Sequence, residues 1–154
     1  MKTLGVLLGT VLLAGCASGP AGVEYPNKVG FVGQNAALQS GCQVNFQDAW
    51  ARDKELEVKL WVSNLSQAFM NIDRDGFALR TADGRVLRRA GDVHNVYTLP
   101  PGGGHEVFVK FKDAGYDLRA NQGVSLIVGG ISFSTDPRPR VVGELPLVAN
   151  GAHN

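Results

Sequence analysis

The sequence predicts an all-β fold, an antiparallel β-sandwich of about seven or eight short strands. Apolar and polar residues alternate over short segments, which is typical of half-buried strands. Turn residues separate these segments, and glycine is frequent, at 20 of 154 residues. No long segment has the periodicity of an amphipathic helix. A chain of this length can bury the core of one domain.

The first fifteen residues differ in composition from the rest of the chain. Lys2 is their only charge, and an apolar run from Leu4 to Ala14 follows it. This run is shorter than the roughly 20 residues that a membrane-spanning helix needs. A positive start, a short apolar stretch and small residues at its end predict a secretory signal peptide over residues 1–15.

The end of this leader, Leu13-Ala14-Gly15-Cys16, carries a specific motif. It resembles the lipobox of bacterial lipoproteins, and the resemblance covers the leader alone. It implies cleavage before Cys16, a diacylglycerol on the Cys16 sulfur and a fatty acid such as palmitate on the new amine. Each buried CH₂ contributes about 0.8 kcal/mol to membrane binding, so these chains would anchor the protein. Ala17, where Asp retains enterobacterial lipoproteins in the inner membrane, resembles outer-membrane sorting.

Cys42 is the other cysteine of the chain. If Cys16 is lipidated, Cys42 is an unpaired thiol in an oxidising envelope. Its sequence neighbours are not basic, which favours a buried and unreactive thiol over a redox role. The alternative is a plain secretory leader, which would leave Cys16 free to form a disulfide with Cys42.

Net charge limits the kind of partner, and composition indicates the domain boundaries. Without residues 1–15 the chain has 14 Lys+Arg and 14 Asp+Glu, because the leader holds one lysine and no acid. A nucleic-acid-binding protein would carry a basic excess, so no nucleic-acid partner is expected. Residues 16–28 hold the lipidated cysteine and a Gly/Pro/Ser-rich tether. The sandwich is expected over residues 29–148 and a flexible tail over 149–154.

The predicted strands follow from their alternation. Residues 56–62 place four apolar side chains on one face and Trp61 on the other, and residues 106–111 repeat the pattern. Residues 124–133 change parity, so a bulge or break is expected at Gly129-Gly130. One helical turn is expected within residues 35–41. The segment containing Pro146 is expected to be an edge strand, because proline donates no ladder hydrogen bond.

A hairpin is predicted around Asp83-Gly84. A three-residue loop with Gly84 in the left-handed region would pair Leu79 with Leu87 and set Arg80 beside Val86. This register keeps one apolar pair together, whereas a two-residue loop would mix polarity on both faces.

Three consecutive segments, VKLWVSNLSQAFMNID, GFALRTADGRVL and LPPGGGHEVFVKF, carry a resemblance. Their order resembles the immunoglobulin-like, telokin-like domains of bacterial lipoproteins and surface antigens, over roughly residues 44–133. The matching positions are Asn64, Phe77, Leu79, Asp83, Gly84, Pro101, Gly102 and Phe111. The resemblance implies an immunoglobulin-like β-sandwich and a surface location more than a chemistry. The Cys…Trp…Cys spacing of true immunoglobulin domains is absent from the sequence.

No catalytic arrangement is recognisable in the sequence, so we expect a protein that is not an enzyme and has no cofactor. A hairpin closed by Pro100–Gly104 would place His105 opposite Leu99 and His94 opposite Lys110. The two histidines would then be too far apart to share a metal. The third, His153, lies in the predicted tail.

The segment NIDRDGF has partial EF-hand spacing at Asn71, Asp73, Asp75 and Gly76. The twelfth position is Ala82, where a bidentate Glu is needed, and no flanking helices are evident. A polar turn is therefore expected, with a weak Ca²⁺ site as the alternative.

Arginines gather around the predicted hairpin: Arg74, Arg80, Arg85, Arg88 and Arg89. They fit either a solvated sheet edge that resists pairing or a docking patch for an acidic protein, lipid A phosphates or another polyanion.

These observations together predict a non-catalytic lipoprotein, anchored in the outer membrane by its lipid. It would act as a protein-interaction or structural module with an envelope protein as partner. A small-ligand or Ca²⁺-binding lipoprotein and an accessory lipoprotein of a secretion or surface apparatus are the alternatives.

Overall fold

The computed structural model describes residues 29–52, 54–91, 94–112 and 123–152, and the account below concerns these residues. Thirteen strands and two single-turn 3-10 helices make up the described chain. They are β1 (Val29–Gly33), β2 (Ala36–Ala37), η1 (Gln39–Gly41), β3 (Cys42–Arg52), β4 (Glu55–Asn64), β5 (Met70–Asp73), η2 (Arg74–Gly76), β6 (Ala78–Arg80), β7 (Val86–Arg88), β8 (Val96–Leu99), β9 (Gly104–Lys112), β10 (Val124–Val128), β11 (Ile131–Phe133), β12 (Asp136–Arg140) and β13 (Gly143–Ala152). Within the described chain, neither helix has the length and hydropathy that crossing a membrane requires.

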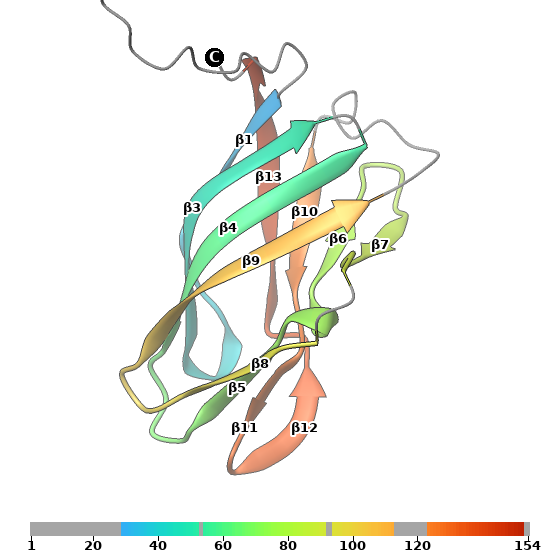
Figure 1. Ribbon diagram of the computed structural model, residues 1–154. Helices are drawn as coiled ribbons and strands as arrows, with labels where there is room; N and C mark the ends of the chain where they lie inside the picture. The colour runs from blue at the N-terminus through green and yellow to red at the C-terminus, as the bar shows by residue number, and fades with distance from the viewer. Residues whose placement is uncertain (1–28, 53, 92–93, 113–122, 153–154) are drawn as a thin grey trace, which may run out of the picture.

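The strands form two sheets, the large sheet and the small sheet. The large sheet has nine strands in the order β7-β6-β10-β13-β1-β3-β4-β9, with β2 added to β3. The small sheet has four, in the order β12-β11-β5-β8. Every pairing among named strands is antiparallel. Figure 1 shows the small sheet at the lower end of the coiled large sheet. The predicted all-β, antiparallel, sandwich-like class is thus confirmed.

The two edges of the large sheet meet. Arg89, which directly follows β7, forms a β-bridge with Phe111 of β9. The N–H of Ala90 donates to the carbonyl of Lys110 at 2.7 Å. The large sheet therefore closes towards a barrel, and part of each edge strand is covered rather than open to pairing with another chain.

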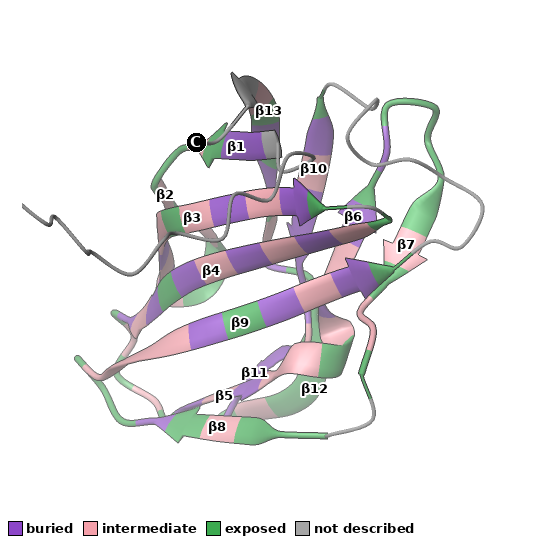
Figure 2. Cartoon of the chain, turned by 45° about the horizontal axis from the view of Figure 1, so that its top comes forward, coloured by how far each residue is buried: buried purple, intermediate pink, exposed green. Residues whose placement is uncertain are grey.

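The hydrophobic core is formed by the side chains that point inward from the strands. Leu56, Val58, Leu60 and Val62 of β4 are all 0% exposed, as their alternation predicts. Each such side chain contributes roughly 1.5–3 kcal/mol by its burial. Figure 2 shows the resulting bands of buried and exposed residues along β4 and β9. Trp61 lies on the outer face and is 39% exposed.

Glycines allow the chain to cross from one sheet to the other. A Cβ on Gly76 would lie 2.2 Å from the N of Gly130. A Cβ on Gly130, whose φ is +71°, would lie 2.1 Å from the carbonyl oxygen of Asp73. The predicted break at Gly129-Gly130 is confirmed, because β10 of the large sheet continues there into β11 of the small sheet. The apolar residues before and after the break both face the core for this reason.

The predicted hairpin has the register expected from the sequence. Leu79 pairs with Leu87 and Arg80 with Val86. Gly84 has a φ of +85°, and its N–H donates to the carbonyl of Thr81 at 2.9 Å. The left-handed glycine closes the three-residue loop that keeps the two leucines together.

The predicted pairing between residues 94–99 and 105–110 is wrong. β8 pairs with β5 in the small sheet, and β9 pairs with β4 in the large sheet. The turn Pro100–Gly104 therefore joins two sheets instead of closing a hairpin. It is held against the end of β4, because Gly102 donates to the carbonyl of Asn64 and Asn64 donates to that of Gly103, both at 2.8 Å.

The last strand was expected at an edge, but β13 lies inside the large sheet between β10 and β1. Pro146 is tolerated there because β1 already ends at Gly33, opposite Leu147. β13 also continues to Ala152, beyond the boundary expected at residue 148, because it pairs with β1 as far as Val29. The described residues form thirteen strands, where seven or eight were expected. Part of the difference arises because a stretch that passes from one sheet into the other counts as two strands, as β10 and β11 do.

Candidate functional site

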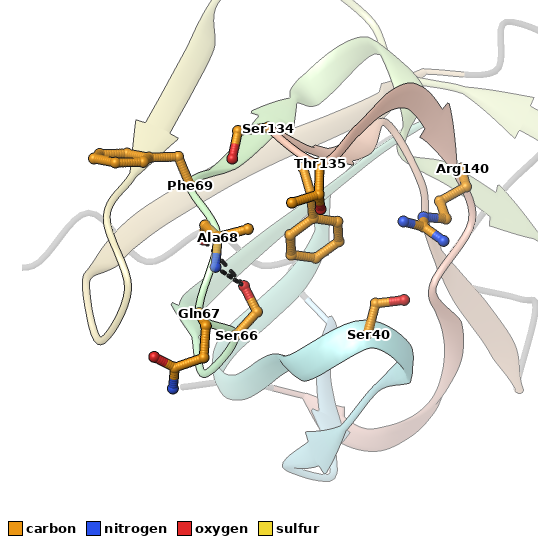
Figure 3. Close-up of a pocket in the computed structure, with 9 residues that line it drawn as sticks. Ser40, Ser66, Gln67, Ala68, Phe69, Ser134, Thr135 and Arg140 are labelled. Carbon is orange, nitrogen blue, oxygen red and sulfur yellow. Dashed lines mark hydrogen bonds between the residues drawn. The ribbon is translucent and has the colours of Figure 1, made fainter.

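An open groove lies at the end of the molecule where the small sheet is found. Its volume is about 450 Å³, and three connections line it. These are η1 with Ser40, the β4–β5 connection over residues 66–69, and the turn after β11 over residues 133–135. Arg140 of β12 completes the lining (Figure 3). The sequence did not predict this groove, because its walls come from segments that are far apart in the chain.

A buried asparagine fixes one wall of the groove. Asn64 is 0% exposed, and its side-chain N–H₂ donates to the carbonyls of Ala68 at 2.8 Å and Leu99 at 3.1 Å. Its side-chain oxygen accepts from the N–H of Ser66 at 3.0 Å and from the Ser66 hydroxyl at 2.7 Å. The Asn64 side chain therefore ties the β4–β5 connection to the end of β8 at Leu99. These contacts give a physical reason for the asparagine that the sequence resemblance placed at this strand end.

The groove combines aromatic, hydroxyl and cationic groups. Phe69 is 52% exposed at its rim, whereas Phe133 is buried at its base. The guanidinium carbon of Arg140 lies 5.4 Å from the centre of the Phe133 ring. Serine and threonine hydroxyls surround these groups, and none of the lining residues is acidic. Nη2 of Arg140 lies 3.7 Å from Oδ2 of Asp136, outside the groove lining. The mixture therefore suits a partner with an apolar side chain and a carbonyl or carboxylate group that shares Arg140 with Asp136.

The five predicted arginines separate into two groups. Arg80, Arg85 and Arg88 belong to the β6–β7 hairpin and are exposed. Arg80 forms an ion pair with Glu144 at 2.9 Å, and Arg85 forms one with Asp83 at 3.1 Å. Their charges are thus partly neutralised by neighbours, which favours the solvated-edge interpretation of this group.

The other two arginines lie beside η2. The Arg89 side chain is 7% exposed, and its Nη2 lies 2.6 Å from Oδ1 of Asp75. Arg74 donates to the carbonyl of Phe108 at 3.4 Å, and its guanidinium carbon lies 5.7 Å from the centre of the Tyr97 ring. These two arginines organise their surroundings and do not present free charge to a partner.

A histidine–carboxylate cluster formed by Asp73, Asp75 and His94 lies at this same place. Each residue offers a ligand atom, and these atoms lie within 4.8 Å of one another. A hydrogen bond from His94 and an ion pair with Arg89 hold the pKa of Asp75 below its usual range. The hydrogen bond to Asp75 and the charge of Asp73 raise the pKa of His94.

The sequence predicted the polar turn but not its histidine. Asp73 caps η2, because its Oδ1 accepts from the N–H of Asp75 at 2.9 Å. His94 arrives beside it through the pairing of β8 with β5, in which Val96 lies opposite Asp73. Assigning that pairing would have revealed the cluster. His105 lies outside it and stacks on Tyr97, with 4.0 Å between ring centres.

The two cysteines of the chain were also singled out in the sequence, and the structure describes one of them. Cys42 faces the core, and burial raises the pKa of its thiol to about 12, which agrees with an unreactive cysteine. Cys16, the predicted lipidation site, and the tether lie outside the described residues.

Comparisons with known proteins place the chain in no family. No family model matches the sequence, and no curated protein matches it. Among solved structures, the chain is similar to one described as the X-ray structure of Northeast Structural Genomics Consortium target SoR45. The identity is 12% and the TM-score 0.45, with 84% of this chain and 92% of the other covered.

Proposed function

We propose that this chain is a lipid-anchored envelope protein that acts as a non-catalytic interaction module and binds a protein partner in its end groove. The observation that carries this proposal is the groove itself, a hollow with an exposed aromatic rim and a wall fixed by Asn64. A fixed wall lowers the conformational entropy that binding must overcome. Aromatic and arginine side chains are also the residue types that contribute most at protein interfaces.

The position of the groove fits an anchor at the N-terminus. Val29 begins β1 and pairs with Ala152 near the end of β13, so the first and last described residues lie together. The β4–β5 connection and the turn after β11, which line the groove, lie at the other end of the molecule (Figure 1). A tether of about twelve residues spans roughly 20 Å root-mean-square. A lipid on Cys16 would therefore hold the domain near the outer membrane with its groove facing away from the point of attachment.

Photo-crosslinking in the native envelope tests the groove. A photoreactive phenylalanine analogue at Phe69 should give one defined crosslinked protein, and Arg140→Gln should weaken that product severalfold. The same analogue at Phe108, which is also exposed but lies on the outer face of β9, is the matched control. No product from Phe69, or an equal product from Phe108, would contradict a groove partner.

The anchor is tested separately by mass spectrometry of the mature protein. A mature chain that begins at Cys16 and carries the mass of its acyl groups is expected. The substitution Cys16→Ser should move the protein from the membrane fraction to the soluble fraction. An unmodified Cys16 would remove the anchor from the proposal and leave the groove experiment unaffected.

A further inference from the structure

Asp73, Asp75 and His94 bring two carboxylates and an imidazole to one exposed point beside η2. We propose that these three side chains bind a divalent transition metal, with Zn²⁺ as the expected ion. The proposal does not depend on the groove, because the cluster lies at the opposite end of β5 from the β4–β5 connection.

The distances suit a small metal ion. Nδ1 of His94 lies 2.7 Å from Oδ2 of Asp75 and 3.6 Å from Oδ1 of Asp73. Zinc binds nitrogen and oxygen at about 2.0–2.2 Å, so two ligand atoms on a tetrahedral ion lie roughly 3.3 Å apart. The distance to Asp75 is that of a direct hydrogen bond, which a metal ion would replace, and the distance to Asp73 is slightly longer than this value. The His94 side chain is 60% exposed, so its ring can turn by the small amount required.

The two carboxylates are already oriented. Oδ1 of Asp73 is directed by the N–H of Asp75, which donates to it at 2.9 Å. The guanidinium of Arg89 holds Oδ1 of Asp75, with Nε at 2.7 Å and Nη2 at 2.6 Å. Oδ2 of Asp75 therefore points to His94 and is the atom available to a metal. Carboxylates that bind metal ions are commonly oriented by hydrogen bonds of this kind from neighbouring residues.

The backbone of His94 is also held in place. With its side-chain amide oriented to satisfy both partners, Asn95 donates to the carbonyl of His94 at 3.0 Å and accepts from Nη2 of Arg74 at 2.9 Å. Arg74 directly follows Asp73 in η2. The histidine therefore approaches the carboxylates from a segment that is tied to the same 3-10 turn.

The donor set distinguishes zinc from calcium. Imidazole nitrogen is a common zinc ligand, whereas calcium takes six to eight oxygen atoms. Ala82 occupies the position where an EF-hand would supply its bidentate Glu. Asp75 is 46% exposed, so water can complete the coordination of an ion bound here. The charge of Arg89 is directed at Oδ1 of Asp75, away from the oxygen that would meet the ion.

Metal binding would join two parts of the fold. Asp73 and Asp75 belong to the end of β5 and to η2, and His94 belongs to the segment that leads into β8. Arg89, which directly follows β7, closes the large sheet against β9. A bound ion would thus fasten the residues that lead into β8 to the corner between the two sheets.

Calorimetry on the full chain, purified in detergent and freed of metal with EDTA, tests the site. Titration with ZnCl₂ should give one saturable binding event, and CaCl₂ at the same concentrations should give none. His94→Ala and Asp75→Asn should each weaken Zn²⁺ binding about tenfold or more. His105→Gln, which removes a histidine outside the cluster, should leave it unchanged.

A second measurement reports on the residue itself. In long-range ¹H–¹⁵N NMR spectra, Zn²⁺ should shift the imidazole nitrogens of His94 and leave those of His105 in place. This readout applies to the unsubstituted protein, so it does not depend on the folding of any variant. Absence of Zn²⁺ binding, or binding that persists in His94→Ala with no shift at His94, would overturn the proposal.

Discussion

The two ends of β5 are held by opposite kinds of interaction. At the groove end, the uncharged and buried side chain of Asn64 binds backbone groups of the β4–β5 connection and of β8. At the other end, the exposed carboxylate of Asp75 is paired with the exposed His94 and with the buried Arg89, and the backbone turns at Gly130. Buried neutral hydrogen bonds are insensitive to pH and salt, whereas exposed charge pairs respond to both. The short strand β5 therefore joins an end whose interactions do not respond to pH and salt to an end whose interactions do.

The largest effect is expected at the corner glycine. Gly130→Ala would place a Cβ against the carbonyl of Asp73 at a positive φ, so we expect a loss of about 3 kcal/mol or more in the free energy of unfolding. Gly84→Ala is the control, because its φ is also positive but no atom lies within 4 Å of the added Cβ. Urea denaturation measures both. Equal losses would mean that the close approach at the corner contributes nothing.

A somewhat smaller effect is expected at Asn64. Asn64→Ala leaves the buried carbonyl of Leu99 without its donor and frees the β4–β5 connection, which should cost about 2–3 kcal/mol. Asn45→Ala on the same sheet is the control, because the Asn45 side chain accepts only a long hydrogen bond of 3.4 Å from Gln43. The same denaturation experiment applies. A loss at Asn64 no greater than at Asn45 would show that the groove wall is not held as described.

A measurable pKa shift without a large change in stability is expected at His94. In the metal-free protein its pKa should lie above the ordinary value, and Asp75→Asn should bring it back down, as followed by NMR titration. Because the folded pKa is the higher one, the interaction stabilises the fold below the unfolded pKa of about 6.5 and is lost as pH rises through the folded pKa. Added salt should reduce the shift. If neither Asp75→Asn nor added salt changes the pKa of His94, the ion pair between His94 and Asp75 is contradicted.

The smallest effect is expected at Cys42, which pairs with Asn64 across β3 and β4. Its thiol is buried and its pKa is raised to about 12, so iodoacetamide at pH 8 should leave it unlabelled in the folded protein. Labelling should begin only with unfolding and should be faster in Asn64→Ala. Rapid labelling of the native chain, read by mass spectrometry, would mean that the groove end opens readily.

The sequence patterns predicted those features of the fold that depend on residues close together in the chain. The alternation at Leu56–Val62 fixed the inward face of β4, and the left-handed position of Gly84 fixed the hairpin register. The partner of β8 was not predictable in this way, because the Pro100–Gly104 turn gives no sign of which sheet the next strand joins. That error separated His94 from Asp73 and concealed the cluster.

The groove was beyond sequence reasoning for a related reason. Its walls come from η1, the β4–β5 connection and the turn after β11, which only the two-sheet arrangement brings together. Asn64 was named from the sequence as one position of a resemblance, but its contact with Leu99 follows from tertiary packing. The division of the arginines between the exposed face of the β6–β7 hairpin and the surroundings of Asp75 likewise depends on where the strands cross.

The pairing of β1 with both β3 and β13 has a mechanical consequence. Val29 enters the sheet at the end where β13 finishes, and the groove lies at the far end of the same strands. Tension between an anchor before Val29 and a partner in the groove would run along β1, parallel to its axis. The hydrogen bonds on both sides of β1 would then be loaded together and not one after another. The proposed tether thus enters the fold through a strand that resists being pulled out.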